Sequence, residues 1–346
     1  MKFTQITIKD IARELGISPS TVSRALKDHP DISKDTKKAV NNLAKKLNYQ
    51  PNIVALNLRK KKTNTIGVII PEIVHFFFST IISGIEDTAH EAGYNVILAQ
   101  SSESLVREKA DVQTLYNSRV DGLLMSISRE TTEYDHIESV LERGLPIVFY
   151  DRNYPNQETS KILVDDFAGS KEAVEHLIDQ GCKRIAHIQA AFKLTIAIER
   201  LRGYQTALSE HNLPFYEGYL QECPGGNVED GLKAMNNLLS LPQQPDGVFA
   251  NNDVLAMGAM QAIKKAGLKI PQDIAVVGFS NWFYSSMIEP PLSSVDQPGF
   301  LMGQEAAKLL IKQIEIIEKD KDAIIVPETK ILKTKLVIRE SSLRKS

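Results

Sequence analysis

The sequence lacks the signatures of several protein classes. Its only two cysteines, Cys182 and Cys223, are too few for a disulfide framework and have no metal-ligand spacing. None of its seven histidines is paired at i and i+4, so neither a metal site nor a cofactor is expected. No stretch approaches the roughly 18 apolar residues of a membrane span, and the start "MKFTQITIKD" has no apolar core of a signal peptide. We therefore expect a cytoplasmic protein that does not meet a membrane.

Common catalytic motifs are missing as well. The sequence contains no GxxxxGK[ST] phosphate loop, no GxGxxG turn and no GxSxG nucleophile elbow. Ser280 in "GFSNW" follows a strand pattern but lacks the second glycine of that elbow, and His187 inside another strand pattern is expected to be a core histidine. These absences argue against an enzyme, although an enzyme on an α/β fold stays open as an alternative.

Charge is divided unevenly along the chain. The 346 residues, with 42% apolar and 24% charged content, suit a globular protein of two or three domains. Residues 1–62 hold 14 Lys and Arg against 5 Asp and Glu, whereas the remainder holds 27 against 38. A basic head on an acidic body indicates that the head meets a polyanion, with a plain basic tail as the alternative.

The head reads as three short helices. Thr7 is placed to cap the first helix, with Asp10 completing a capping box and Gly16 ending the helix. Ser18 is placed to cap the second helix, and a third helix is expected from near Ser33. The apolar stripes are Ile8, Ile11, Ala12 and Leu15, then Val22, Ala25 and Leu26, then Val40, Leu43, Ala44 and Leu47.

The first two helices and their tight turn have the spacing of a helix-turn-helix unit. The second helix of such a unit has the width to enter the DNA major groove. It would expose small hydroxyl groups and Arg24, whose guanidinium suits guanine or phosphate. A helical hairpin with a solvated polar face is the alternative.

From residue 65 onward, short β-branched runs alternate with amphipathic helical patterns. This alternation predicts an α/β fold with parallel sheets covered on both faces. Ligands bind beyond the carboxyl ends of strands in such folds, and polar pairs follow four of the strand patterns. These pairs are Asp151 and Arg152, Asp165 and Asp166, Asn252 and Asp253, and Ser280 and Asn281.

Several blocks in a fixed order carry a resemblance to a known family. They include "TIKDIARELGISPSTVSRAL", "YQPNIVALNLRKKK", "FANNDVLAMGAMQAIKKAGLKIPQDIAVVGF" and "PPLSSVDQP". Along nearly its whole length the chain resembles the lac repressor family of bacterial transcription regulators. The resemblance implies a homodimeric repressor that binds a near-palindromic operator in double-stranded DNA under the control of a small molecule of the sugar class.

The resemblance also implies a domain plan. It comprises a helix-turn-helix head at 1–50, a hinge helix at 51–62, and an effector-binding and dimerisation domain at 63–346 that resembles periplasmic sugar receptors. Lobe one of this domain would span about 63–162 and 294–325, and lobe two about 163–293 and 326–346. The alternative from another class is a sugar-binding transport receptor, which needs an export signal and has no use for a basic head.

The resemblance implies two sets of binding residues. The DNA-contacting positions fall on Thr7, Ser18, Pro19, Ser20, Thr21, Ser23, Arg24, Ser33 and Thr36 in the head, and on Asn52, Val54, Ala55 and Leu58 in the hinge. The effector-binding positions fall on Phe77, Phe78, Asp151, Arg152, Arg200, Asn252, Ser280, Asn281, Trp282 and Gln297. For the effector, an aromatic face would meet the C–H surface of a sugar, and Arg, Asp and Asn would meet its hydroxyl groups.

Some of these positions have simpler explanations. Ser280 stands where many members have Asp, so either Trp282 or Asn281 would have to replace that carboxylate. Asp253 would simply cap the helix that follows it, and Phe78 would simply pack in the core. In the hinge, Leu58 would wedge between base steps in the minor groove, whereas a solvated linker is the alternative for the basic run 59–62.

Overall fold

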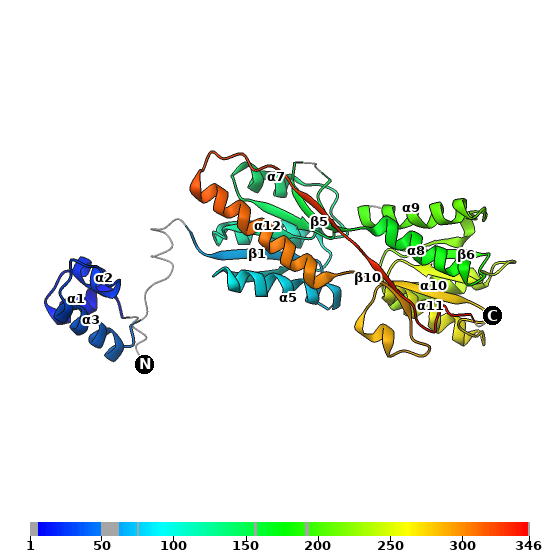
Figure 1. The fold of residues 1–346 in the computed structure, drawn as a ribbon, viewed down its shortest axis with the longest axis horizontal. Helices are drawn as coiled ribbons and strands as arrows, with labels where there is room; N and C mark the ends of the chain where they lie inside the picture. Colours follow the sequence, from blue (N-terminus) through cyan, green and yellow to red (C-terminus); the bar gives the residue numbers. More distant parts are fainter. Residues whose placement is uncertain (1–5, 50–61, 75, 156–157, 191–193, 345–346) are drawn as a thin grey trace. The chain divides into compact units, whose positions relative to one another are not determined.

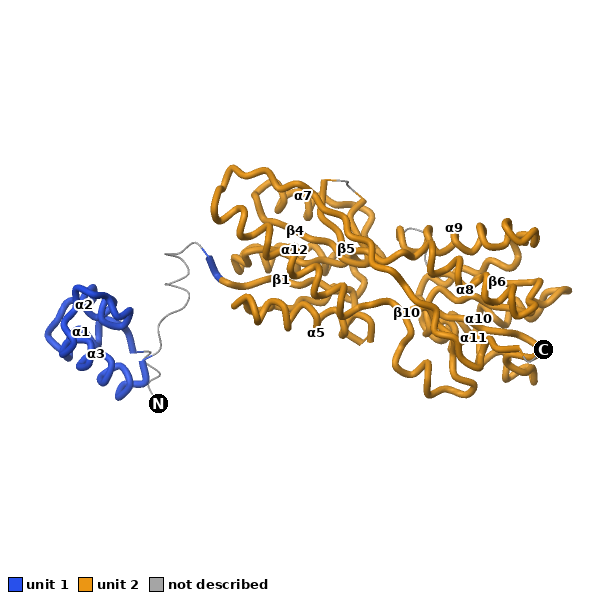
Figure 2. The backbone as a smooth tube through the Cα atoms, in the orientation of Figure 1, with its two compact units in different colours: residues 1–63 blue, residues 64–346 orange. Residues whose placement is uncertain are grey.

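The computed structural model describes residues 6–49, 62–74, 76–155, 158–190 and 194–344. The chain forms two compact units, Met1–Thr63 and Asn64–Ser346, which Figure 2 colours separately. No helix in the described ranges combines the length and apolar character needed to cross a bilayer.

The first unit is a bundle of three helices, α1 (Ile8–Leu15), α2 (Pro19–Leu26) and α3 (Lys34–Lys46). The predicted capping box forms, since Asp10 Oδ2 accepts the Thr7 N–H at 2.9 Å and the Thr7 hydroxyl at 2.7 Å. Gly16 ends α1 in the left-handed conformation with φ 65°. The predicted stripes meet in one small core around Ile11, Val22 and Val40.

The second unit contains two sheets, and each is the centre of one lobe (Figure 1). The first-lobe sheet has the order β11-β5-β4-β3-β1-β2, and all of its neighbouring strands are parallel. Its strands are β1 (Thr65–Ile70), β2 (Asn95–Gln100), β3 (Gly122–Met125), β4 (Ile147–Tyr150), β5 (Ser160–Val164) and β11 (Thr329–Leu332). Helices α5 (Phe76–Glu91) and α12 (Gly299–Lys319) cover one face of it, and α6 (Leu105–Asn117) and α7 (Asp135–Glu142) cover the other.

The second-lobe sheet has the order β12-β10-β9-β8-β6-β7, with only the pair β10 and β12 antiparallel among the described strands. Its strands are β6 (Ile185–Gln189), β7 (Leu220–Glu222), β8 (Gly247–Ala250), β9 (Ala275–Ser280), β10 (Ser293–Asp296) and β12 (Lys335–Val337). Helices α8 (Asp166–Asp179) and α9 (Thr195–Glu210) pack on one face, and α10 (Val228–Leu239) and α11 (Asp253–Lys265) on the other. Two short 3-10 turns, η1 (Glu217–Tyr219) and η2 (Phe283–Ser286), complete the lobe.

The chain passes between the lobes three times. The crossings fall between β5 and α8, between β10 and α12, and between β11 and β12, whose long run Figure 1 shows in red. The predicted placement of 326–346 in lobe two is wrong for β11, because Thr329–Leu332 pairs with Lys161–Val164 of the first-lobe sheet. The other two crossings also lie a few residues later than predicted, since β5 extends to Val164 and β10 belongs to the second-lobe sheet.

Helices α5 and α12 pack at very short range beside one crossing. A Cβ added at Gly84 would lie 2.1 Å from the carbonyl oxygen of Phe300, and one at Gly303 would lie 2.1 Å from that of Ile81. No side chain fits at either position, so the two glycines allow the helix backbones to touch. This contact ties the start of α12, which follows a crossing, to the helix that begins with Phe76.

Candidate functional site

The exposed surface of the head carries a row of hydroxyl groups at the start of α2. The Oγ atom of Ser18 accepts the N–H of Thr21 at 3.1 Å and lies within hydrogen-bond distance of the hydroxyls of Ser20 (2.7 Å) and Thr21 (2.8 Å). Ser18, Pro19 and Ser20 are exposed, and Ser23 is half-buried. Arg24 is exposed, and within residues 6–49 its guanidinium makes no hydrogen bond or ion pair. This helix start is therefore compatible with binding an anion such as a phosphate group.

A second helix start in the head has the same construction. Ser33 Oγ accepts the N–H of Thr36 at 3.2 Å, and the two hydroxyls lie 2.8 Å apart. The predicted cap at Ser18 is thereby confirmed, and Ser33 caps α3, which begins where the sequence predicted a helix. The predicted hinge contacts Asn52, Val54, Ala55 and Leu58 lie outside the described residues.

A pocket lies between the lobes of the second unit, at the carboxyl ends of both sheets. Its lining includes nine of the ten predicted effector residues and Phe76, Glu103, Arg129, Asn251 and Asp253, besides a few apolar and glycine positions. The nine are Phe77, Phe78, Asp151, Arg152, Arg200, Asn252, Ser280, Trp282 and, at the crossing before α12, Gln297. Asn281 alone among the predicted set is not part of it.

Aromatic side chains form the apolar part of the pocket wall. Phe78 is buried and belongs to the first-lobe core, so the core explanation and the pocket explanation both hold for it. Phe76 is 40% exposed, and its ring centroid lies 6.1 Å from that of Phe283, which belongs to the second lobe. Trp282 is half-buried and packs edge-on against Tyr284. These rings offer flat apolar surface from both lobes.

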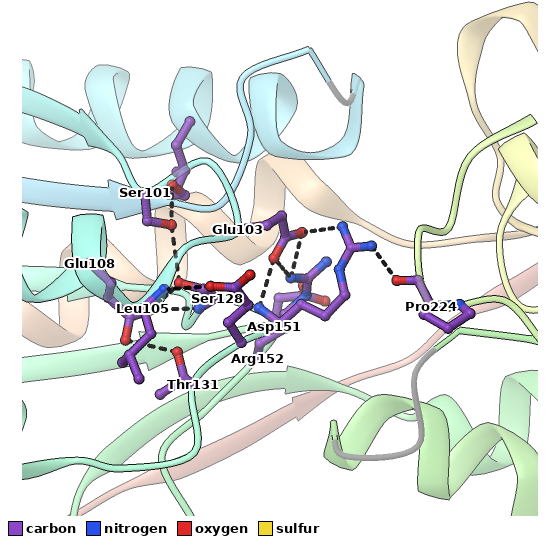
Figure 3. Close-up of polar contacts among 12 residues, drawn as sticks. Ser101, Glu103, Leu105, Glu108, Ser128, Thr131, Asp151, Arg152 and Pro224 are labelled. Carbon is purple, nitrogen blue, oxygen red and sulfur yellow. Dashed lines mark hydrogen bonds and ion pairs between the residues drawn. The ribbon is translucent and has the colours of Figure 1, made fainter.

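Glu103 is the centre of an ion-pair network on the first-lobe side (Figure 3). Both of its carboxylate oxygens accept from Arg152 Nη1 at 2.8 Å, and Oε2 also accepts the backbone N–H of Arg129 at 2.7 Å. Burial by itself would raise the pKa of Glu103, but Arg152 and Arg129 hold this pKa below its usual range. The carboxylate is therefore charged and fixes Arg152, one of the predicted effector residues.

Arg129 extends this network across to the second lobe. Its guanidinium forms an ion pair with Glu103 at 3.2 Å and donates to the carbonyl oxygen of Pro224. Pro224 follows β7 in the second lobe, and Figure 3 shows the hydrogen bond that ends on it. The Arg129 side chain thus joins the two lobes beside the pocket, through Glu103 in the first lobe and Pro224 in the second.

Asp151 offers an acceptor that the protein leaves unused. The residue is 5% exposed, and within the described ranges its carboxylate oxygens accept no hydrogen bond. Its nearest cation is Arg152, whose Nε atom lies 3.9 Å away. Burial raises the pKa of Asp151 to about 6, although Arg152 opposes this shift. A ligand that donates hydrogen bonds would supply what this carboxylate lacks.

Arg200 is largely committed to its own lobe. Its Nε and Nη2 atoms bind Asp166 Oδ1 at 2.7 and 2.6 Å, and Nη1 donates to the carbonyl oxygen of Asn251 at 2.6 Å. The guanidinium also lies 3.7 Å from the centre of the Phe279 ring. The residue is 3% exposed, so it presents little more than the remaining N–H groups to the pocket.

Of the neighbours Asn252 and Asp253, it is Asn252 that caps helix α11, whereas Asp253 binds other segments of the second lobe. Asn252 Oδ1 caps α11 by accepting the N–H of Leu255 at 2.8 Å, so the prediction of Asp253 as the cap is wrong. Asp253 is 1% exposed and accepts from the Trp282 N–H and the hydroxyls of Ser285 and Ser294 at 2.5 to 2.6 Å. Burial raises the pKa of Asp253 to about 6, and these donors oppose the shift. Asp253 thus anchors the loop that carries Trp282.

Ser280 and Asn281 differ in what they contact. Ser280 Oγ donates to Gln297 Oε1 at 2.8 Å, which leaves Gln297 Nε2 without a hydrogen-bond partner in the described chain. Asn281 instead bonds Asp296 Oδ1 at 2.8 Å and Arg339 Nη2 at 2.7 Å. The suggestion that Asn281 replaces a missing carboxylate in the pocket is therefore wrong, because loop contacts occupy its side chain.

Glu103 and Arg129 were not among the predicted residues. Both follow strands of the first-lobe sheet, after "NVILAQ" and after "GLLMSI", where polar residues were expected to gather. Ligands in such folds bind beyond the carboxyl ends of the strands, and applying this rule to every strand would have selected both residues. It would not have shown their pairing, which depends on the positive φ of Ser102 (51°) and Glu103 (59°).

Comparisons with known proteins agree on one family. Residues 7–52 match the model of bacterial regulatory proteins of the lacI family, and residues 174–342 match a periplasmic binding protein-like domain. The chain is 34% identical to a ribose operon repressor of Halalkalibacterium halodurans, over 97% of each chain. It is 35% identical to the transcriptional repressor PurR of Histophilus somni, over 97% of this chain and 98% of the relative.

Among solved structures, a lac repressor dimer bound to operator and an anti-inducer is similar to the whole chain. The TM-score is 0.84 at 26% identity, and the match covers 99% of this chain and 100% of the other.

Proposed function

Because the chain belongs to the lacI family of bacterial regulatory proteins, we propose that it represses transcription from a near-palindromic operator and that a sugar-like molecule controls its DNA affinity. The protein is a DNA-binding transcription regulator with a small-molecule effector, and its relatives are repressors rather than enzymes. We place it in the cytoplasm, where its operator would be. The alternatives of a transport receptor and of an α/β enzyme are dropped.

One observation carries the proposal more than any other. A lacI-type head and an inter-lobe pocket belong to the same chain, and the pocket contains a buried carboxylate, Asp151, that accepts no hydrogen bond in the described residues. A hydroxyl-rich ligand that donates to Asp151 and contacts Phe77 and Trp282 would bind one arrangement of the lobes better than another. That difference in affinity is all that ligand control of DNA binding requires.

We propose a division of labour within the head and hinge. Thr7, Ser18, Ser33 and Thr36 bind phosphates through their hydroxyls and the adjacent backbone N–H groups. Ser20, Thr21, Ser23 and Arg24 meet base edges, and Pro19 shapes the start of the reading helix. Asn52, Val54, Ala55 and Leu58 of the hinge contact the minor groove.

A second copy of the chain is the proposed partner on the operator. One relative in the comparisons is a dimer on its operator. On this chain, apolar side chains near the β2 edge of the first-lobe sheet are at least 38% exposed, which suits a protein surface that pairs with another. They are Ile73, Val74, Ile97, Leu98 and Val106.

The test has a DNA arm and an effector arm. Binding of full-length protein to DNA from upstream of its own gene should be specific and should weaken steeply between about 50 and 200 mM salt. Leu58→Ala should reduce this binding strongly and leave effector binding unchanged, whereas Arg24→Ala should weaken it mainly on the specific site. Absence of any specific, salt-sensitive site would refute the proposed function.

A further inference from the structure

Three side chains at the carboxyl ends of β6 and β8 are buried without the hydrogen bonds they need. Gln189 is 0% exposed, and neither its Oε1 nor its Nε2 has a partner in the described chain. Asn251, at 2% exposure, has no partner for Oδ1, and His187, at 0% exposure, has none for Nε2. Buried polar groups in native proteins are nearly always paired, so a group of three calls for a ligand or water.

The register of the sheet places these side chains together. His187 pairs with Phe249, so Gln189 lies beside Asn251 two residues further along the parallel strands. Residues two apart on a strand project from the same face, here the face covered by α8 and α9. Asn251 and Ala190, which follow β8 and β6 directly, both line the effector pocket. The unpaired atoms therefore lie immediately behind the second-lobe wall of that pocket.

The balance of donors and acceptors identifies what is missing. His187 Nδ1 lies 3.0 Å from the carbonyl oxygen of Phe249, which only accepts, so Nδ1 carries the proton and Nε2 is an acceptor. Burial lowers the pKa of His187 to about 4, so the ring is neutral. The unpaired atoms are then three acceptors, on His187, Gln189 and Asn251, and one amide nitrogen, Gln189 Nε2, which carries two N–H groups. A partner that both donates and accepts hydrogen bonds fits this set.

Charge around the group argues against an anion. Asp166 and Asp151 are both buried nearby, and the adjacent guanidinium of Arg200 is already bound to Asp166 and to the Asn251 carbonyl. A phosphate or carboxylate brings acceptors only and would leave the three acceptors unpaired. Hydroxyl groups, which both donate and accept, satisfy the whole set.

We propose that Gln189 and Asn251 form a second-lobe subsite of the effector pocket that binds hydroxyl groups of an uncharged polyol and rejects its phosphate esters. This inference rests on the proposed function and names the chemistry of its effector. Asn251 is the outer residue because it lines the pocket, whereas Gln189 and His187 are not in the lining, so a ligand meets Gln189 only if the Asn251 side chain moves. The His187 ring stacks on that of Phe249, with 4.8 Å between the ring centroids.

A matched control exists in the other lobe. Gln313 on α12 is 4% exposed, but its Nε2 donates to Ser160 Oγ at 2.7 Å. Replacing a paired buried amide with an apolar side chain of similar shape leaves its partner without a hydrogen bond and lowers the unfolding free energy. Replacing an unpaired buried amide removes an unfavourable burial and does not lower it. We therefore expect Gln189→Met and Gln313→Met to change the stability of the unliganded protein in opposite directions.

The experiment compares full-length wild type, Gln189→Met, Asn251→Leu and Gln313→Met. Melting temperatures are measured alone and with D-ribose, D-glucose, cellobiose, adenosine, D-ribose 5-phosphate and D-glucose 6-phosphate, followed by calorimetric affinities. We expect Gln189→Met to melt at or above the wild-type temperature and Gln313→Met to melt below it. For the neutral compound that wild type binds, Gln189→Met and Asn251→Leu should weaken affinity about tenfold or more, and Gln313→Met should not.

Any of four results would overturn the subsite. The first is a melting temperature of unliganded Gln189→Met as low as that of Gln313→Met. The second is wild-type affinity in both Gln189→Met and Asn251→Leu, as expected if ordered water alone pairs the buried atoms. The third is binding of phosphate esters as tight as that of neutral compounds, and the fourth is no binding of any neutral compound. Failure of the proposed function has its own signature in wild type, namely operator binding that no bound compound changes.

Discussion

The two walls of the effector pocket differ in whether their buried polar side chains have hydrogen-bond partners within the protein. On the first-lobe wall, Glu103 is bound to Arg152 and to Arg129, so both guanidinium groups have a carboxylate partner. On the second-lobe wall, the side chains of Gln189 and Asn251 are buried with atoms that have no partner in the described chain. The first wall pairs its charged groups largely with one another, apart from Asp151 and the Nε atom of Arg152, whereas the second leaves buried amide groups for a ligand to pair.

Removing the central carboxylate of the first wall should have the largest effect. Glu103→Gln leaves the guanidinium groups of Arg152 and Arg129, with side chains 14% and 24% exposed, without their anion. We expect the unfolding free energy in urea to fall by about 3 kcal/mol. The matched control is Glu133→Gln, which breaks the solvent-exposed pair with Lys109 and should change the unfolding free energy far less. Equal losses in the two variants would contradict a stabilising role for the Glu103 network.

Asp151 is the exception on the first wall, because its carboxylate accepts no hydrogen bond in the described chain and lies 3.9 Å from Arg152 Nε, and Asp151→Asn sharpens the comparison. Its pKa is about 6 in the folded protein against 3.8 in the unfolded chain, so the native state holds the proton more tightly between these values. The unfolding free energy of unliganded wild type should therefore fall as pH rises from about 4 to about 6. At pH 8, Asp151→Asn should be more stable than wild type by on the order of 2 kcal/mol, while its effector affinity should drop.

The measurement is urea denaturation of both proteins from pH 4 to pH 8. The slope should become shallower in Asp151→Asn but not vanish, because burial also raises the pKa of Asp253 to about 6. A variant that is less stable than wild type at pH 8 would show that the carboxylate has a structural partner.

Breaking the contact that joins the walls should have the smallest effect on stability. Arg129→Gln removes the hydrogen bond to Pro224 and the ion pair with Glu103, with an expected cost of about 1 kcal/mol. Stopped-flow measurements should show effector dissociation several times faster with little change in association, because the contact forms when the lobes close. Arg143→Gln, which alters an arginine stacked on Tyr116 within the first lobe, should leave both rates unchanged.

Local rules predicted much of this molecule. The caps at Thr7 and Ser18 depend on residues within three positions in sequence, and they form as expected. The strands were visible because parallel strands are apolar on both faces. Asp151 and Arg152 were found because the end of a strand is a known place for ligands.

Long-range partners account for what was missed. Asn281 is turned away from the pocket by Arg339, which lies 58 residues later in the sequence. Asp253 does not cap α11, because this helix begins one residue earlier than expected and Asp253 accepts from Ser285 of η2 and Ser294 of β10. Strand β11 was assigned to the wrong lobe because its pairing with β5 joins residues 168 positions apart, such as Thr329 and Lys161. No periodicity in the sequence contains that information.

The pairing of β11 with β5 also sets an order of events during synthesis. The first-lobe sheet needs an edge strand made near the end of the chain, and α12, which covers one face of that sheet, comes only shortly before it. The second lobe, between α8 and β10, is translated almost completely before either segment exists. A nascent chain therefore carries the incomplete first lobe with apolar surface uncovered while the second lobe assembles. The effector pocket, which needs both lobes, is complete only after the last crossing has left the ribosome.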